Sequence, residues 1–407
     1  MTAGNREPRA PALVLGTGQT ALGVVRILGR AGIPLYVTSS DRGPIRWSRW
    51  CRAAPRTHPG DRPDDLPAYL EALGLDAGVL IPCSDDSARA VACLPPELGA
   101  RFPASLSTPD TLASFTDKGR LSALLERYGV PHPRTVVVDG ALDARDALAG
   151  LEGEAFIKPR NSQAFFARFG VKGFWVKEAA DLSGRLDELS SAGFAVVVQE
   201  YLPGGASAHY FIDGFVDRSG TVRALFARRR MRMYPIDFGN STAMRTVPVE
   251  DVREAADALG RLLTGTGYRG IFSAEFMEDE RDGRLKLLEV NTRAWWFVEF
   301  AARCGVDVVS MAYRDALGEP VDTIDRYDVG RRLVFPYYDS RACAHLVREG
   351  ELAWGDMLRS WLGADGVYFA RDDPAPALAS LALTGSRVFR GRLRRAVRAR
   401  PRSTAAP

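Results

Sequence analysis

The chain has 407 residues, 46% hydrophobic and 26% charged, a composition typical of a globular protein of two or three domains without a membrane span. Residues 385–407 hold eight arginines and no acid, and removing them from the net charge of +4 leaves about −4, so the body is not expected to bind nucleic acid. Five scattered cysteines without a CxxC pair, four separated histidines and a polar start at residues 1–9 predict a cytoplasmic protein with no signal peptide, disulfide framework or zinc site.

The first 107 residues are expected to form a Rossmann-like domain. An apolar strand from Ala12 runs into the turn Gly16-Thr-Gly18-Gln-Thr-Ala21, a helix follows, and a second strand at 34–38 ends near Asp41. A G-x-G-x-x-A turn followed by an acid is typical of a dinucleotide site. The same turn also opens domains that bind no nucleotide, so it leaves an NAD(P)-dependent oxidoreductase as an alternative function.

Two acids, Asp85 and Asp86, follow the next expected strand at 78–82. Open α/β sheets bind ligands at the carboxyl ends of their strands, so these acids are candidate substrate contacts. The alternative is that one of them caps the following helix. Both interpretations stay open.

A helix from Lys118 begins the middle of the chain, with Leu121, Leu124 and Leu125 at helical spacing. The elements expected after it are strands at 135–138, 155–159, 173–177 and 195–200 and helices at 141–151 and up to about 191, with a loop at 160–173 between two of the strands. Lys118 lies at a helix start, where the helix dipole disfavours a cation, and this favours a functional role for it. Apolar neighbours argue against Lys158 being an ordinary surface lysine.

A hairpin at 271–290 carries the most informative pattern. Because side chains alternate along a strand, Glu289 and Asn291 share one face, and Glu275 on the partner strand can face them. Two carboxylates and an amide oxygen form the hard-oxygen set that Mg²⁺ prefers. The alternative is a pair of surface glutamates. The apolar residues Leu285, Leu287, Leu288 and Val290 predict a buried strand, whose carboxylate would need a cation.

Upstream of this hairpin, Arg230 and Arg232 alternate with Met231 and Met233. Period-two alternation predicts that both arginines face the same cleft. An exposed strand edge blunted by charge is the alternative interpretation.

In this order, the motifs resemble the ATP-grasp carboxylate–amine ligases, in the branch that includes D-aspartate ligase. The motifs are Thr-Asp-Lys118, Phe-Ile-Lys158-Pro, Gln199-Glu200-Tyr201-Leu202-Pro-Gly, Arg230-Met-Arg232, Glu275 and Glu289-Val-Asn291-Thr-Arg293. The resemblance implies an α/β (α+β) fold of the ATP-grasp type with an N-terminal Rossmann-like pre-ATP-grasp domain. It also implies ATP and Mg²⁺ as cofactors.

The resemblance further assigns roles to these residues. Lys118 and Lys158 would hold the phosphates of ATP, and Gln199, Glu200, Tyr201 and Leu202 would receive adenine. Glu275, Glu289 and Asn291 would bind one or two Mg²⁺ ions. Arg293 would contact the substrate acyl group or the transferring phosphoryl group, with Arg230 and Arg232 as further catalytic candidates.

The reaction implied is phosphorylation of a carboxylate by ATP, followed by attack of an amine on the acyl phosphate to give an amide, ADP and phosphate. A nucleotide-binding ATP-grasp protein without catalysis is a further alternative, because the loop at 161–170 is poorer in glycine and serine than is usual in the family. No ribose-binding acid is assigned, although Ser207 lies in the relevant stretch. Trp295 and Trp296 could stack on a substrate or pack in the core.

The expected domains are 1–107, the Rossmann-like domain; 108–320, the ATP-grasp domain, with a small lid subdomain at about 130–202 and a catalytic subdomain at about 203–320; 321–384, an extension packed on the body; and 385–407, an arginine-rich tail. The substrates are expected to be a small carboxylate and a small amine, such as amino acids. For the tail, a solvated terminus and contact with an acidic membrane surface or a carrier protein are the alternatives. A homodimer is left open.

Overall fold

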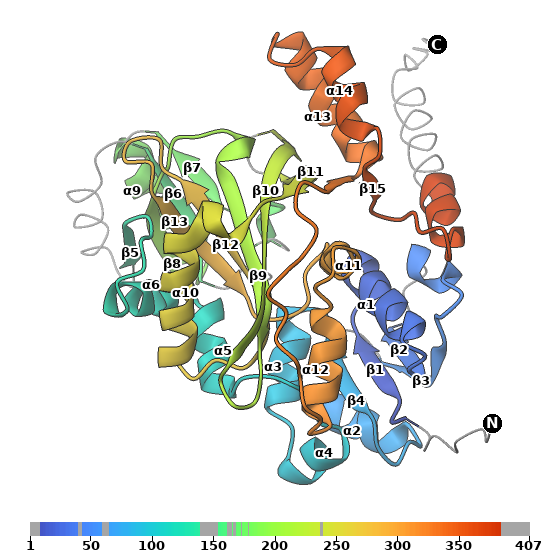
Figure 1. Cartoon of the computed structure of the whole chain (residues 1–407). Coiled ribbons are helices and arrows are strands. Elements are labelled where there is room, and N and C mark those ends of the chain that lie inside the picture. The colour runs from blue at the N-terminus through green and yellow to red at the C-terminus, as the bar shows by residue number, and fades with distance from the viewer. Residues whose placement is uncertain are drawn as a thin grey trace, which may run out of the picture.

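The computed structural model describes residues 9–39, 43–58, 65–138, 154–160, 165, 168–171, 173–177, 179–236 and 239–383. Three β-sheets organise this part of the chain (Figure 1). The helix expected at 141–151, most of the loop at 160–173, Asp41 and the tail at 385–407 lie outside the described residues. No helix in the described part of the chain is long and apolar enough to cross a bilayer.

The N-terminal sheet is parallel, with helices on both faces. Its strands are β1 (Ala12–Leu15), β2 (Leu35–Ser39), β3 (Ala53–His58) and β4 (Val79–Pro82), in the order β3-β2-β1-β4. The helices are α1 (Gly18–Arg30), α2 (Leu66–Ala72), α3 (Asp85–Ala92) and α4 (Pro96–Arg101). Alternate residues of β1 point to opposite sides: Val14 packs in the core with α1, whereas Leu13 packs with α2 and α4.

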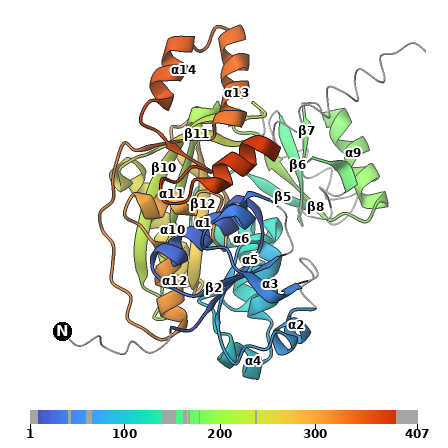
Figure 2. The ribbon, with the colours of Figure 1, turned by 90° about the vertical axis from the view of Figure 1, so that its right-hand side faces the viewer.

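A small antiparallel sheet follows two helices, α5 (Pro109–Thr116) and α6 (Lys118–Arg127). Its strands are β5 (Thr135–Val138), β6 (Ala155–Pro159), β7 (Phe174–Val176) and β8 (Val196–Glu200), in the order β5-β8-β6-β7. Ala155 and Ile157 pack on one face together with leucines of α9 (Ala179–Ser191). The register places Lys158 on the other face of β6, and Figure 2 shows this sheet beside the large one.

The large sheet has seven strands in the order β13-β12-β9-β10-β11-β14-β15. Their bounds are β9 (His209–Val216), β10 (Val222–Tyr234), β11 (Asn240–Thr246), β12 (Gly270–Glu278), β13 (Leu285–Asn291), β14 (Arg332–Val334) and β15 (Asp365–Gly366). The hairpin predicted at 271–290 is confirmed as β12 and β13. One face, with Ile212, Phe272 and Ala274, packs on α10 (Arg253–Gly265).

The other face of the large sheet changes character along its strands. At one end Phe215, Phe226 and Ile271 pack with α1, α11 (Val298–Arg303) and α12 (Val308–Ala316). Farther along the strands, this face carries charged side chains such as Arg230 and Glu275 instead of aromatic ones. The apolar end joins the large sheet to the N-terminal sheet, and the charged end faces the small sheet.

The C-terminal part packs on the edge of the large sheet. Helices α13 (Pro336–Arg348) and α14 (Trp354–Trp361) stand out from the body beside β10 and β11 (Figures 1 and 2). Strand β14 is short, because Pro336 begins a helix two residues after the strand ends. The buried Arg26 of α1 binds Asp373, so the end of this part is fastened to the N-terminal helix.

Candidate active site

The three predicted metal ligands are brought together by the register of the β12–β13 hairpin. Glu275 lies opposite Glu289, and Ser273 lies opposite Asn291, so all four side chains point to one face of the sheet. The Asn291 Nδ2 atom lies 3.5 Å from Glu289 Oε1. The side chains of Glu275, Glu289 and Asn291 therefore share one face of the sheet, as the E-x-N spacing predicts.

The burial of this set differs from the prediction. Strand β13 is the edge of the sheet, and Glu289 is exposed, whereas Glu275 on the inner strand is the enclosed carboxylate, with 16% of its side chain accessible. The prediction that Glu289 lies on a buried strand is wrong, because an edge strand is covered by a neighbour on one side alone.

Glu275 is held by two donors. Arg230 Nη2 donates to its Oε1 at 2.9 Å, and His209 Nδ1 lies 2.8 Å from the same oxygen. Burial works to raise the pKa of Glu275, but the charge of Arg230 and the hydrogen bond from His209 outweigh it, so the pKa lies well below its usual range. Glu275 is therefore ionised at neutral pH. Sequence reasoning missed His209, which a period-two count along β9 would have placed on this face.

The second arginine of the pair has different partners. Arg232 Nη2 donates to Asp339 Oδ2 of α13 at 2.7 Å, and Thr242 Oγ1 donates to Asp339 Oδ1 at 2.6 Å. A β-bulge separates Arg230 from Arg232 on β10, and a bulge re-aims the side chains on either side of it. This corrects the prediction that both arginines face one cleft: Arg232 fastens α13 to the sheet.

Lys158 approaches the carboxylates from the small sheet. Its Nζ donates to Gln199 Oε1 at 2.6 Å, and Gln199 Nε2 donates to Thr135 Oγ1 at 3.0 Å. Burial lowers the pKa of Lys158 to about 8; the charge of Glu289 opposes this, while Lys118 adds to it. The charges of three groups therefore affect one another. They are Lys118 at the start of α6, Lys158 on β6 and the carboxylates of the hairpin.

The predicted adenine turn follows β8. Glu200 Oε2 accepts from the Arg134 backbone N–H at 3.0 Å, and Glu200 Oε1 accepts from Arg281 at 2.5 Å. The Tyr201 ring stacks on Trp175, with centroids 5.4 Å apart and planes 20° apart. Leu202 is buried against Met277 of the large sheet. The turn is thus built where the two sheets meet.

Arg293 connects the hairpin to the N-terminal sheet. Its Nη2 donates to Asn291 Oδ1 at 3.1 Å, and its Nε donates to Asp85 Oδ1 at 3.2 Å. Ser84 provides the side-chain cap of α3, so the cap interpretation does not apply to Asp85, which pairs with Arg293. Of the two tryptophans, Trp295 is buried in the core and Trp296 is 43% exposed.

Glu275, Glu289 and Asn291 are the candidate magnesium ligands. Across the described residues, no three His, Cys, Asp or Glu side chains are grouped to hold a metal ion. The predicted set has two carboxylates and completes its oxygens with the Asn291 amide. Mg²⁺ is usually held by one or two carboxylates together with phosphates and waters, so these residues fit it.

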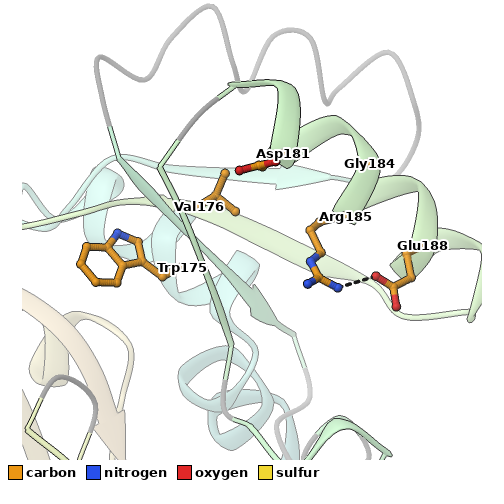
Figure 3. A pocket seen from close by; sticks show the side chains of 6 residues that line it. All are labelled: Trp175, Val176, Asp181, Gly184, Arg185 and Glu188. Atoms are coloured by element: carbon orange, nitrogen blue, oxygen red, sulfur yellow. Dashed lines mark hydrogen bonds and ion pairs between the residues drawn. The ribbon is translucent and has the colours of Figure 1, made fainter.

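A separate cavity of about 440 Å³ lies between β7 and α9 (Figure 3). Its lining consists of Trp175, Val176, Asp181, Gly184, Arg185 and Glu188. In Figure 3 the Trp175 side chain points to the opposite side of the strand from Val176, and Arg185 pairs with Glu188 at 2.7 Å. The lining includes none of the residues predicted to bind ATP or metal.

No protein-family model matches the chain. Among characterised proteins, it is 23% identical over 225 residues to D-aspartate ligase of Enterococcus faecium (strain Aus0004), covering 53% of each chain. It is 25% identical over 236 residues to the arginine-specific large chain of carbamoyl phosphate synthase of Geobacillus stearothermophilus, covering 56% of this chain and 21% of that one. The chain therefore spans about half the length of the first relative and less of the second.

Solved structures cover more of the chain. N5-carboxyaminoimidazole synthetase of Staphylococcus aureus superposes with a TM-score of 0.62 at 14% identity, over 79% of this chain and 80% of that one. The biotin carboxylase domain of the Hydrogenobacter thermophilus 2-oxoglutarate carboxylase superposes with a TM-score of 0.64 at 17% identity, over 79% and 73%. These likenesses show a shared fold.

Proposed function

We propose that this chain, which has the ATP-grasp fold, is an ATP-dependent carboxylate–amine ligase that works through an acyl phosphate and releases ADP and phosphate. The fold class and the resemblance stated from the motif series are confirmed by the structures and relatives above. The activity is inferred for this chain from its own residues, because the relatives are distant.

One observation carries the proposal. Glu275, Glu289 and Asn291 share one face of the large sheet, and Lys158 of the small sheet lies within reach of their charges. ATP brings about four negative charges, which lysines and metal ions offset in enzymes that transfer its phosphoryl group. Lys158 on the small sheet and the side-chain oxygens of Glu275, Glu289 and Asn291 on the large sheet support binding of a nucleotide between the two sheets.

Each residue has a role of positioning or charge neutralisation. Lys118 and Lys158 would bind the phosphates, and the turn from Gln199 to Leu202 would receive adenine through its backbone. Glu275, Glu289 and Asn291 would hold Mg²⁺, which when bound neutralises charge on the phosphates. Arg293 would stabilise charge that develops on the phosphoryl or acyl group.

The neighbours of Glu275 explain how it is aimed. Arg230 and His209 both contact its Oε1, and Ser241 Oγ accepts from Arg230 Nε at 2.8 Å. A carboxylate held through one oxygen can direct the other toward a metal. Arg230 and His209 are therefore positioning residues in this proposal.

The test is a screen of amino acids and small carboxylates in pairs with MgATP, read by phosphate release and mass spectrometry. We expect phosphate release that requires both partners, together with a product whose mass is that of the pair minus water. Binding of MgATP without release for any pair would favour a non-catalytic nucleotide-binding protein. A thermal shift with NAD(P)H but not with MgATP would instead favour the oxidoreductase.

A further inference from the structure

The glycine turn after β1 and Asp85 after β4 lie at the place where the strand order of the N-terminal sheet reverses. In the order β3-β2-β1-β4, the chain leaves β1 toward β2 and β3 and then returns to the other side of β1 with β4. Open α/β sheets bind ligands at such a topological switch point, outside the carboxyl ends of the strands. A Cβ on Gly16 would lie 2.6 Å from the Cys83 Cβ, so the turns after β1 and β4 are in contact.

Arg293 reaches this switch point from the side of the large sheet. Its guanidinium lies 3.2 Å from Asp85 Oδ1 and 3.1 Å from Asn291 Oδ1, so one side chain joins the switch point to the proposed metal residues. A ligand at the switch point would therefore lie next to the site where phosphoryl transfer is proposed.

The Asp85–Arg293 pair is suited to being opened. The Asp85 side chain is 42% exposed and that of Arg293 17%. Partly exposed ion pairs contribute little to stability, so a small ligand can replace the direct contact at little cost. The exposed acid and the adjacent guanidinium then present opposite charges to it.

We propose that the Asp85–Arg293 pair at this switch point binds the amine substrate as a zwitterion, an α-amino acid or a compound with the same two groups, with Asp85 on the ammonium and Arg293 on the carboxylate. The inference rests on the proposed ligase function, because it identifies the substrate class of that site. A guanidinium binds a carboxylate through two parallel hydrogen bonds, and a carboxylate accepts strongly from an ammonium. A compound with one of the two groups leaves the other residue unpaired.

Calorimetry on the full chain saturated with MgADP tests this. The probes are glycine and both enantiomers of alanine, serine, aspartate and lysine, each compared with its 2-hydroxy acid and its decarboxylated amine. We expect at least one amino acid to bind in a 1:1 ratio, and each of its two analogues to bind at least tenfold more weakly, about 1.4 kcal/mol. MgADP binding in the same sample shows that the protein is folded.

Variants separate Asp85 from its neighbourhood. Asp85→Asn should weaken amino-acid binding at least tenfold and leave MgADP affinity unchanged, and Asp85→Glu should retain part of the amino-acid binding. Glu97→Gln, at an exposed position of α4, is the control and should behave as wild type. Unchanged amino-acid binding in Asp85→Asn overturns the inference. Binding of MgADP but of none of the amino acids overturns it while the proposed function stands. Absence of MgADP binding overturns both.

Discussion

Two of the arginine–carboxylate pairs on strand β10, those of Arg230 and Arg232, look alike in sequence and differ in their surroundings. Asp339, the partner of Arg232, is fully buried and also accepts from Thr242 and from Trp361 Nε1 at 2.7 Å. Glu275, the partner of Arg230, has donors on one oxygen and lies opposite the exposed Glu289, within reach of Lys158. The Asp339 carboxylate accepts hydrogen bonds on both of its oxygens from groups of the protein. The Glu275 carboxylate is held through one oxygen and lies next to charged groups that could bind a ligand. This difference separates a structural pair from a site.

The largest effect should come from breaking the structural pair. Arg232→Met leaves Asp339 buried without its cation, and we expect a loss of about 3–5 kcal/mol in the free energy of unfolding, measured by urea denaturation. Arg359→Met, at an exposed position of α14, is the control and should change little. The double variant Arg232→Met/Asp339→Leu should recover much of the loss, and no recovery would show that the charge is not the cause.

The next largest effect concerns the site around Glu275. Glu289→Gln removes one metal-type carboxylate, and we expect ligase turnover to fall by about 10²–10³-fold or more, because charge stabilisation of this kind is worth about 2.7–4 kcal/mol. Stability should be nearly unchanged, since Glu289 is exposed. Glu280→Gln, an exposed acid in the turn of the same hairpin, is the matched control. Near-normal ADP release by Glu289→Gln would contradict the assignment.

Lys158→Ala should weaken MgATP binding by about 10- to 100-fold, equivalent to about 1.4–2.8 kcal/mol, because a partly buried cation next to the phosphates is lost. Calorimetry measures the affinity directly. Lys177→Ala removes an exposed lysine just after the neighbouring strand and should bind as wild type. Equal affinities for the two variants would count against a phosphate-binding role for Lys158.

The smallest expected effect is the uptake of a fraction of a proton when MgATP binds. In the free protein the pKa of Lys158 lies at about 8, so about half of the molecules carry the neutral amine at pH 8. Bound phosphates favour the charged form and raise this pKa, so MgATP binding should take up about half a proton at pH 8 and almost none at pH 6.5. MgATP affinity should accordingly fall as the pH rises through about 8.

Calorimetry in two buffers of different ionisation enthalpy measures the uptake. In Lys158→Arg, whose guanidinium stays charged, the uptake should vanish. Wild-type protein that takes up no proton at pH 8 would show that Lys158 is already fully charged without ligand.

What the sequence determined by itself was local. The alternation of side chains along a strand placed Glu289, Asn291 and Glu275 on one face, because strand geometry repeats every two residues whatever surrounds it. The order of the motifs indicated the fold. Tertiary structure alone decided the rest: a bulge separated Arg230 from Arg232, an edge position exposed Glu289, and packing brought Arg293 to Asp85, 208 residues away. Such contacts depend on how distant segments pack, and no spacing within one segment records that.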